Sequence, residues 1–149
     1  MATAWLTPSE MAAWRNFIET YYDLVSALER DLSAHGISLG DYQVLVYLSE
    51  SEKHQMRMCD LAERLQLSPS GLTRRLDGLV KAGLVRREPS TADRRVMMAT
   101  LTDAGMAALQ ESAPHHVDSV RRRVFDHLDD EQVDYMASIF AAIGKGLAS

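Results

Sequence analysis

The chain has little cysteine and no long apolar segment, and both shortages exclude classes of protein. Its single cysteine, Cys59, cannot form a disulfide within the chain, which is typical of a reducing compartment. No run of about 18 apolar residues occurs, and no basic segment followed by an apolar one opens the chain. Neither a membrane span nor a secretory signal is therefore predicted, and the expected location is the cytoplasm.

Motifs of catalysis and metal binding are also missing. The sequence contains no nucleophile elbow, phosphate-binding loop or paired-acid motif, so an enzyme is not predicted. It contains no H-E-x-x-H and no paired C-x-x-C, and the adjacent His115 and His116 cannot chelate a metal as an i, i+4 pair would. We therefore predict no metal site and no cofactor.

An overall excess of positive charge is absent too, but the charge is unevenly distributed. The net charge is -5 over 149 residues, of which 46% are hydrophobic and 25% charged, as in a soluble globular protein of one domain. Between Met56 and Leu101, however, nine Lys and Arg accompany five Asp and Glu, giving +4 and leaving -9 for the remainder. Because phosphate is attracted to the first surface and repelled by the second, segment 56–101 is the part predicted to bind nucleic acid.

The stretch from Ser68 to Thr100 contains the most informative pattern. Ser68-Pro69 is typical of an N-cap followed by the first helical turn, and Gly83 is typical of a helix end. Between them, apolar residues recur at the spacing of one buried helix face: Leu72, Leu76, Leu79 and Val80.

The opposite face of this helix suits the major groove of DNA. It carries small residues, hydroxyls and guanidiniums, namely Ser70, Gly71, Thr73, Arg74 and Arg75. Arg74 and Arg75 point about 100° apart, so one is expected to reach bases and the other phosphate. A shorter apolar stripe, separated from Ser68 only by Gln66-Leu67, precedes this helix: Met58, Leu61, Ala62 and Leu65. Two short helices joined by a tight turn, the second one basic, predict a helix-turn-helix.

Two strand-like runs follow, Leu84–Glu88 and Val96–Leu101, around a loop with an arginine-rich end. They predict a two-stranded β-hairpin wing whose tip, with Arg94 and Arg95, follows the minor groove. Asp93 is expected to orient a nearby arginine or stabilise the loop, because carboxylates repel phosphate. Arg86 and Arg87 alternate sides of a strand, so at most one of them faces the duplex.

The run from Leu61 to Gly105 resembles the DNA-binding core of the MarR family of bacterial transcriptional regulators. Its most specific part is D-x-R at Asp93 and Arg95, followed by a strand and Leu101-Thr102-x-x-Gly105. The resemblance implies a homodimeric regulator, a repressor released from a pseudo-palindromic operator by a small ligand, and associated with the nucleoid when bound. The predicted DNA-binding residues are Ser68, Pro69, Ser70, Gly71, Thr73, Arg74, Arg75, Asp93, Arg94 and Arg95.

Helices are predicted on both sides of this core. Thr7-Pro8-Ser9-Glu10 is typical of a capping box, and an apolar heptad seam follows it: Trp14, Ile18, Tyr21, Val25, Leu28 and Leu32. Ser38 is expected to cap the next helix, and SESEKHQ to be a polar connector. A long helix should open at Thr102-Asp103 and reach Leu128, kinked or split at Pro114, before Asp129-Asp130-Glu131-Gln132 caps the last helix.

The fold class is therefore mostly α (α+β), a winged helix-turn-helix with terminal helices that form a dimerisation module. The module comprises residues 1–37 and 102–149, and the DNA-binding lobe residues 38–101. The predicted dimerisation residues are Trp14, Ile18, Val124, Met136, Ile139, Phe140 and Ile143. The apolar seam could instead pack within its own chain.

The family resemblance also implies an effector pocket with aromatic walls and a cation for a small aromatic or phenolic acid. Trp14, Arg15 and Tyr42 are the candidates, although the aromatics could equally be simple core residues. Three competing hypotheses stay open. They are a winged helix used as a protein-interaction module, a redox-responsive regulator acting through Cys59, and a metal-responsive regulator acting through histidines: His35, His54, His115, His116 and His127.

Overall fold

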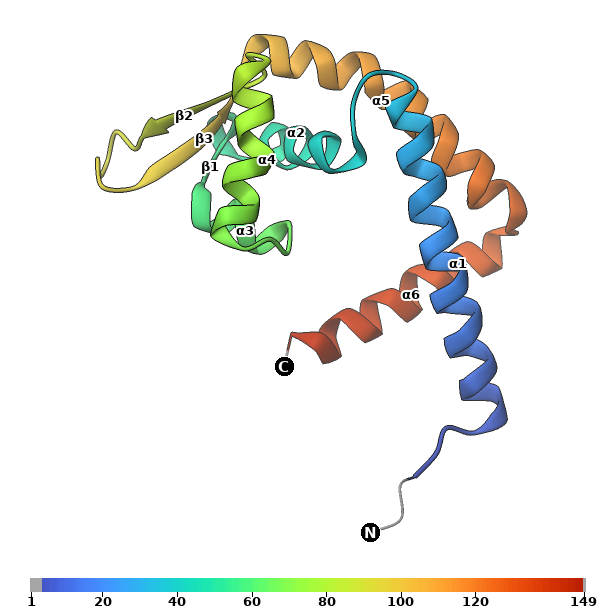
Figure 1. Cartoon of the computed structure of the whole chain (residues 1–149). Coiled ribbons are helices and arrows are strands. Elements are labelled where there is room, and N and C mark those ends of the chain that lie inside the picture. Colours follow the sequence, from blue (N-terminus) through green and yellow to red (C-terminus); the bar gives the residue numbers. More distant parts are fainter. Residues whose placement is uncertain (1–3, 149) are drawn as a thin grey trace. The chain divides into compact units, whose positions relative to one another are not determined.

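The computed structural model describes residues 4–148, which form helices and one small antiparallel sheet (Figure 1). In chain order the elements are α1 (Pro8–Ser33), α2 (Leu39–Glu50), the 3-10 helix η1 (Glu52–His54), β1 (Gln55–Arg57), α3 (Met58–Arg64), α4 (Pro69–Lys81), β2 (Val85–Pro89), β3 (Met97–Leu101), α5 (Asp103–Arg123), the 3-10 helix η2 (Phe125–His127) and α6 (Asp130–Leu147). The predicted mostly α, winged helix-turn-helix class is confirmed. Within residues 4–148, no helix is both long and apolar enough to cross a membrane.

The chain divides into two compact units, and each is described by itself. The central unit is Glu29–His115, and the terminal unit contains the described residues up to Leu28 and from His116 onward. The central unit is larger than the lobe predicted over 38–101. It begins inside α1 and ends inside α5, so it includes the end of the first helix and the start of the second. The dimerisation role given to the terminal helices stays a prediction.

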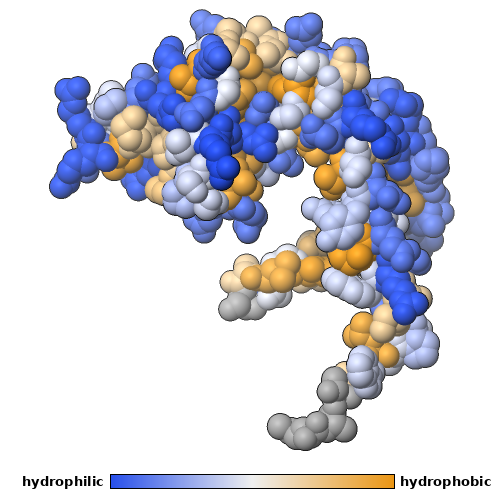
Figure 2. Space-filling model, in the orientation of Figure 1, coloured by the Kyte–Doolittle hydropathy of each residue, from blue (hydrophilic) through white to orange (hydrophobic). Residues whose placement is uncertain are grey.

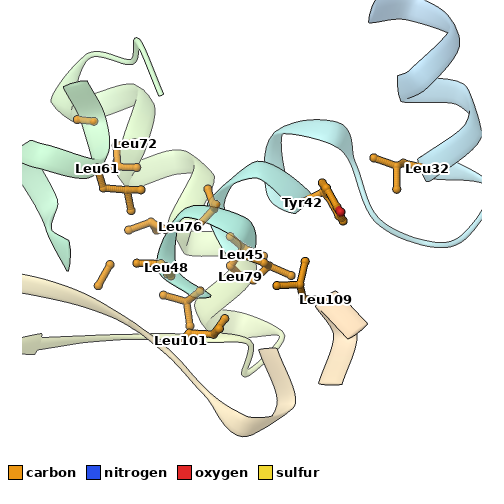
Figure 3. Packing of buried hydrophobic residues seen from close by; sticks show 14 residues of the cluster. Leu32, Tyr42, Leu45, Leu48, Leu61, Leu72, Leu76, Leu79, Leu101 and Leu109 are labelled. Atoms are coloured by element: carbon orange, nitrogen blue, oxygen red, sulfur yellow. The ribbon is translucent and has the colours of Figure 1, made fainter. Parts of the chain in front are cut away.

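The core of the central unit comes from the apolar stripes of the helix-turn-helix and from α2. The predicted stripe of α4 is confirmed, since Leu72, Leu76 and Leu79 are all buried. Figure 3 shows Leu76 and Leu79 beside Leu45 and Leu48 of α2, and Leu72 beside Leu61 of α3. Burying a leucine contributes about 1.5–3 kcal/mol, so this cluster is the main source of the stability of the lobe.

The sheet has three strands where two were predicted. Its order is β1-β3-β2, and all pairs are antiparallel, with Arg57 opposite Met98 and Val85 opposite Leu101. The connector predicted over SESEKHQ is therefore wrong at both ends, because α2 continues to Glu50 and Gln55 begins β1. Lys53 and His54 both adopt φ of 55°, which turns the chain so that three residues with no apolar alternation can pair with β3.

In the terminal unit, the N-termini of α1 and α6 have the predicted caps, whereas the C-terminus of α5 differs from the prediction. The backbone N–H of Thr7 donates to Glu10 Oε2 (2.7 Å) and that of Glu10 to Thr7 Oγ1 (3.2 Å), which confirms the capping box of α1. Asp129 and Gln132 form a second capping box at α6. The helix predicted to reach Leu128 instead ends at Arg123.

Pro114 does not split α5, which runs without interruption from Asp103 to Arg123. The proline has no N–H to donate to the carbonyl of Gln110, so α5 lacks one backbone hydrogen bond there. The boundary between the two compact units falls directly after this turn, between His115 and His116.

Candidate nucleic-acid interface

The N-terminus of α4 is fixed by residues that were predicted to contact DNA. Ser68 is the N-cap, and its Oγ accepts a hydrogen bond from the N–H of Gly71 (3.1 Å), while Pro69 occupies the first turn. The hydroxyl of Thr73 donates to the carbonyl of Pro69 (3.0 Å). These contacts leave the first turn of α4 exposed, with N–H groups at its end that favour a phosphate.

The turn before α4 holds it against α3. Gln66 adopts φ of 55°, and the N–H of Leu67 donates to the carbonyl of Ala62 (2.9 Å). This arrangement is the predicted helix-turn-helix. With the α4 stripe buried, Ser70, Thr73 and Arg74 are exposed on the opposite side of the helix.

The two consecutive arginines of α4 have different surroundings. Arg74 is exposed and forms no ion pair within residues 4–148. Arg75 is half-buried: its Nη1 lies 3.2 Å from Asp41 Oδ1 and 3.3 Å from Ser38 Oγ, at the N-terminus of α2. Arg74 is thus the guanidinium of α4 that is available to DNA, whereas contact through Arg75 stays a prediction.

The wing presents its arginines on an ordered tip. The N–H of Ser90 donates to the carbonyl of Val96 (2.7 Å), closing the loop between β2 and β3. Asp93 accepts hydrogen bonds from the backbone and side chain of Arg95, as expected for a carboxylate that orients an arginine. These bonds, the side-chain ones first, and the charge of Arg57 hold the pKa of Asp93 below its ordinary value. Figure 2 shows strongly hydrophilic residues at this end of the unit.

Ion pairing divides the nine cations of segment 56–101 into two groups. Five are paired with acids: Arg64 with Glu50, Arg75 with Asp41, Arg86 with Glu88, Arg87 with Asp77, and Arg95 with Asp93. Four have no ion pair among the residues that the structure describes: Arg57, Arg74, Lys81 and Arg94. Unpaired, exposed cations are the ones free to replace counterions on phosphate.

Arg57 belongs to the second group, although its sequence context did not single it out. It lies at the end of β1, opposite Met98, and its charge acts on Asp93 of the wing. Arg57 lies within the basic segment 56–101, but no pattern in the neighbouring residues predicted β1. Only the pairing of β1 with β3 brings Arg57 to the wing.

The other predicted residues are scattered rather than gathered into one site. Tyr42 is buried in the core of the central unit, and burial raises the pKa of its hydroxyl. Trp14 and Arg15 are exposed on α1, in the terminal unit. Cys59 is exposed, with Sγ 3.5 Å from Asp60 Oδ1, and no group of three or more metal-ligating side chains occurs within residues 4–148.

The terminal unit contains a mostly apolar groove of about 730 Å³. Of the residues predicted for dimerisation, Val124, Met136 and Phe140 line it, and the rings of Phe140 and Phe17 lie 5.8 Å apart. Further large apolar side chains of this unit are exposed: Trp14, Tyr21, Tyr135, Ile139 and Ile143. Figure 2 shows apolar residues gathered along α6.

Comparisons with known proteins point to one family. A sequence profile described as the MarR family matches residues 35–96. The crystal structure of AbsC, a MarR family transcriptional regulator from Streptomyces coelicolor, superposes with a TM-score of 0.91 at 41% identity, covering 98% of this chain and 99% of AbsC. Sco3205, from the same organism and crystallised in complex with DNA, gives 0.92 at 38% identity over 99% of this chain and 93% of Sco3205.

A further relative is known as a repressor. The HTH-type transcriptional repressor YetL of Bacillus subtilis (strain 168) is 27% identical over 121 residues, which are 81% of this chain and 72% of YetL.

Proposed function

The chain belongs to the MarR family of transcriptional regulators, and we propose that it represses transcription as a homodimer bound to a pseudo-palindromic operator. Members of this family are DNA-binding proteins rather than enzymes. The observation that carries the proposal is the exposed, unpaired Arg74 on α4, in the same compact unit as a wing whose tip presents Arg94 and Arg95. The complex of Sco3205 with DNA supports DNA as the ligand of this surface.

On DNA, α4 would enter the major groove by its exposed first turn. Arg74 can then donate two hydrogen bonds to a guanine edge, and Ser70 can reach phosphate. The wing would place Arg94 and Arg95 in the adjacent minor groove, where the negative potential is strongest if the groove is narrow. Arg57 would add a phosphate contact close to the wing.

A homodimer would form through the terminal unit. Contiguous exposed apolar surface of this kind marks an interaction site, and a second copy of the chain supplies a surface of the same composition. Two recognition helices related by a two-fold axis read half-sites about one helical turn apart, which gains both affinity and specificity.

A small aromatic or phenolic acid is the proposed effector. The groove of the terminal unit has aromatic walls from Phe17, Tyr21 and Phe140, and Arg122 and Arg123 line it as cations. Trp14 and Arg15 stay candidates on accessible surface, whereas Tyr42 is a core residue. A ligand would release DNA only by favouring a dimer in which the recognition helices no longer match the half-sites.

The test is a salt-titrated binding assay on DNA from upstream of the protein's own gene, beside a scrambled duplex of equal length. We expect tight binding to the first only, with log K falling linearly as log salt rises. Equal or absent binding to both duplexes, followed by failure to enrich any sequence from a random library, would favour the protein-interaction module instead.

A further inference from the structure

We propose that Ser38, Asp41 and Arg75 form a clamp between α2 and α4 that sets the orientation of the recognition helix, so that Arg75 is a positioning residue. This inference rests on the proposed function, because an orientation of α4 has consequences only if α4 reads DNA. It assigns different roles to two arginines that the sequence presents as an equivalent pair. Arg74 contacts DNA, and Arg75 holds α4 in the orientation that brings Arg74 to the DNA.

The clamp is built on the N-terminus of α2. Ser38 is the N-cap, and its Oγ accepts hydrogen bonds from the N–H of Asp41 (3.1 Å) and from Arg75 Nη1 (3.3 Å). The same Nη1 donates to Asp41 Oδ1 at 3.2 Å. The Arg75 and Asp41 side chains are 35% and 32% exposed, so solvent screens the pair less than it screens the pairs of the wing.

Two neighbours prepare this position. The N–H of Leu39 donates to Glu29 Oε2 (2.8 Å), which holds the first turn of α2 against the end of α1. Residue 40 is glycine, and a Cβ placed there would overlap the guanidinium of Arg75. The absence of that one atom therefore makes room for the clamp.

A second ion pair fixes the other flank of α4. Asp77 Oδ1 lies 2.6 Å from Arg87 Nη2, which joins α4 to β2. Residues 75 and 77 point about 200° apart around a helix, so the two pairs hold α4 from opposite sides. The leucine stripe between them sets how deeply α4 packs, but apolar contact has no preferred direction, whereas charged hydrogen bonds do.

Rotation of α4 about its axis is the motion that the clamp opposes. A 10° rotation moves the outer surface of a helix, about 6 Å from its axis, by roughly 1 Å. Arg74 points outward from the position directly before Arg75, so its guanidinium would move at least that far. A two-point hydrogen bond to a base edge does not tolerate such a displacement.

The experiment separates positioning from direct contact with three variants. Gly40→Ala displaces the Arg75 guanidinium without removing any charge, and the flexible side chain can move aside, so the fold is retained. Asp41→Ala removes the partner, and Arg75→Ala removes the guanidinium itself. Gly144→Ala is the matched control, because it adds the same methyl group to α6, outside the unit that holds α4, and a Cβ there meets nothing within 4 Å. Arg74→Ala serves as the reference for a DNA contact.

Each protein is titrated with its operator and with a scrambled duplex over a range of salt, after its active fraction and thermal unfolding have been measured. For the clamp we expect Gly40→Ala, Asp41→Ala and Arg75→Ala each to lower operator affinity about tenfold, with scrambled-DNA affinity and the salt slope unchanged. The Asp41→Ala/Arg75→Ala double variant should be no weaker than either single one, since both remove the same contact.

A role of Arg75 in direct contact predicts a different pattern. Gly40→Ala and Asp41→Ala would then bind as the wild type does, and only Arg75→Ala would lose affinity. Its slope of log K against log salt would also become shallower by about 0.9, the contribution of one phosphate contact. That result overturns the clamp and leaves the proposed function standing, provided Arg74→Ala is impaired. A wild-type protein that never prefers an operator overturns both.

Discussion

The Asp93 carboxylate and the Arg95 guanidinium form a two-point ion pair at the tip of the wing. Asp93 Oδ1 accepts from Arg95 Nε at 3.2 Å and Oδ2 from Nη2 at 3.2 Å, while the backbone N–H of Arg95 donates to the same Oδ1 at 3.0 Å. The D-x-R pattern is thus a local device in which the acid shapes the loop and directs the arginine, with most of the Arg95 side chain still in solvent.

The first prediction concerns the pH dependence of this wing. The pKa of Asp93 is below its ordinary 3.8, so the hydrogen bonds to Arg95 are fully present above that value and are lost as pH falls through the lower, folded pKa. The carboxyl ¹³C shift of Asp93 should therefore titrate with a midpoint below the ordinary 3.8. In an Arg95→Gln variant the Asp93 midpoint should rise, because its main hydrogen-bond partner is gone. The same midpoint in the wild type and the variant would contradict the pairing.

Replacing Arg74 should weaken operator binding strongly. We expect Arg74→Ala to lose about 10- to 100-fold in affinity for the operator, the range that one bidentate base contact provides. Fluorescence anisotropy at fixed salt measures the loss. Arg121→Ala, which removes an exposed arginine of the terminal unit, is the control and should bind as the wild type does. Equal losses in the two variants would remove Arg74 from the interface.

Gly105 should not tolerate a side chain. A Cβ at residue 105 would overlap the carbonyl oxygen of Leu84, which is backbone and accepts from the N–H of Thr102 (3.1 Å). We expect Gly105→Ala to lower the free energy of unfolding by about 1–3 kcal/mol, as overpacking does. Urea denaturation followed by circular dichroism measures the change. An unaltered midpoint would show that α5 has room to move, and Gly78→Ala provides the unstrained comparison.

A charge on the exposed face of α6 should prevent self-association. Ile139 is 53% exposed, and burying Glu at that position in an interface would cost several kcal/mol without a partner. Sedimentation velocity should therefore find a dimer for the wild type and the 16.6 kDa monomer for Ile139→Glu, with operator affinity reduced as well. Ser138→Glu adds the same charge one position away, outside the predicted dimerisation set, and should stay dimeric. A wild-type monomer would contradict the proposed assembly.

The sequence by itself determined the features that depend on neighbours along the chain. The Ser68 cap and the Asp93–Arg95 pair rest on contacts within a few residues, and the stripe at Leu72, Leu76 and Leu79 follows the helical period, so spacing alone predicts all three. The capping boxes at Thr7 and Asp129 are of the same kind.

Tertiary structure decided what depends on distant partners. Arg75 differs from Arg74 because Asp41 lies 34 residues earlier in sequence and meets only one of them. A three-residue strand such as β1 has no periodicity to detect and exists because β3 offers free backbone groups. The end of α5 at Arg123 was missed because apolar residues continue beyond it, and only the backbone at Val124, with φ of -123° and ψ of -68°, ends the helix. Local hydrogen bonds and apolar spacing can be read from neighbouring residues. Which of Arg74 and Arg75 is paired depends on a partner that only the folded chain brings close.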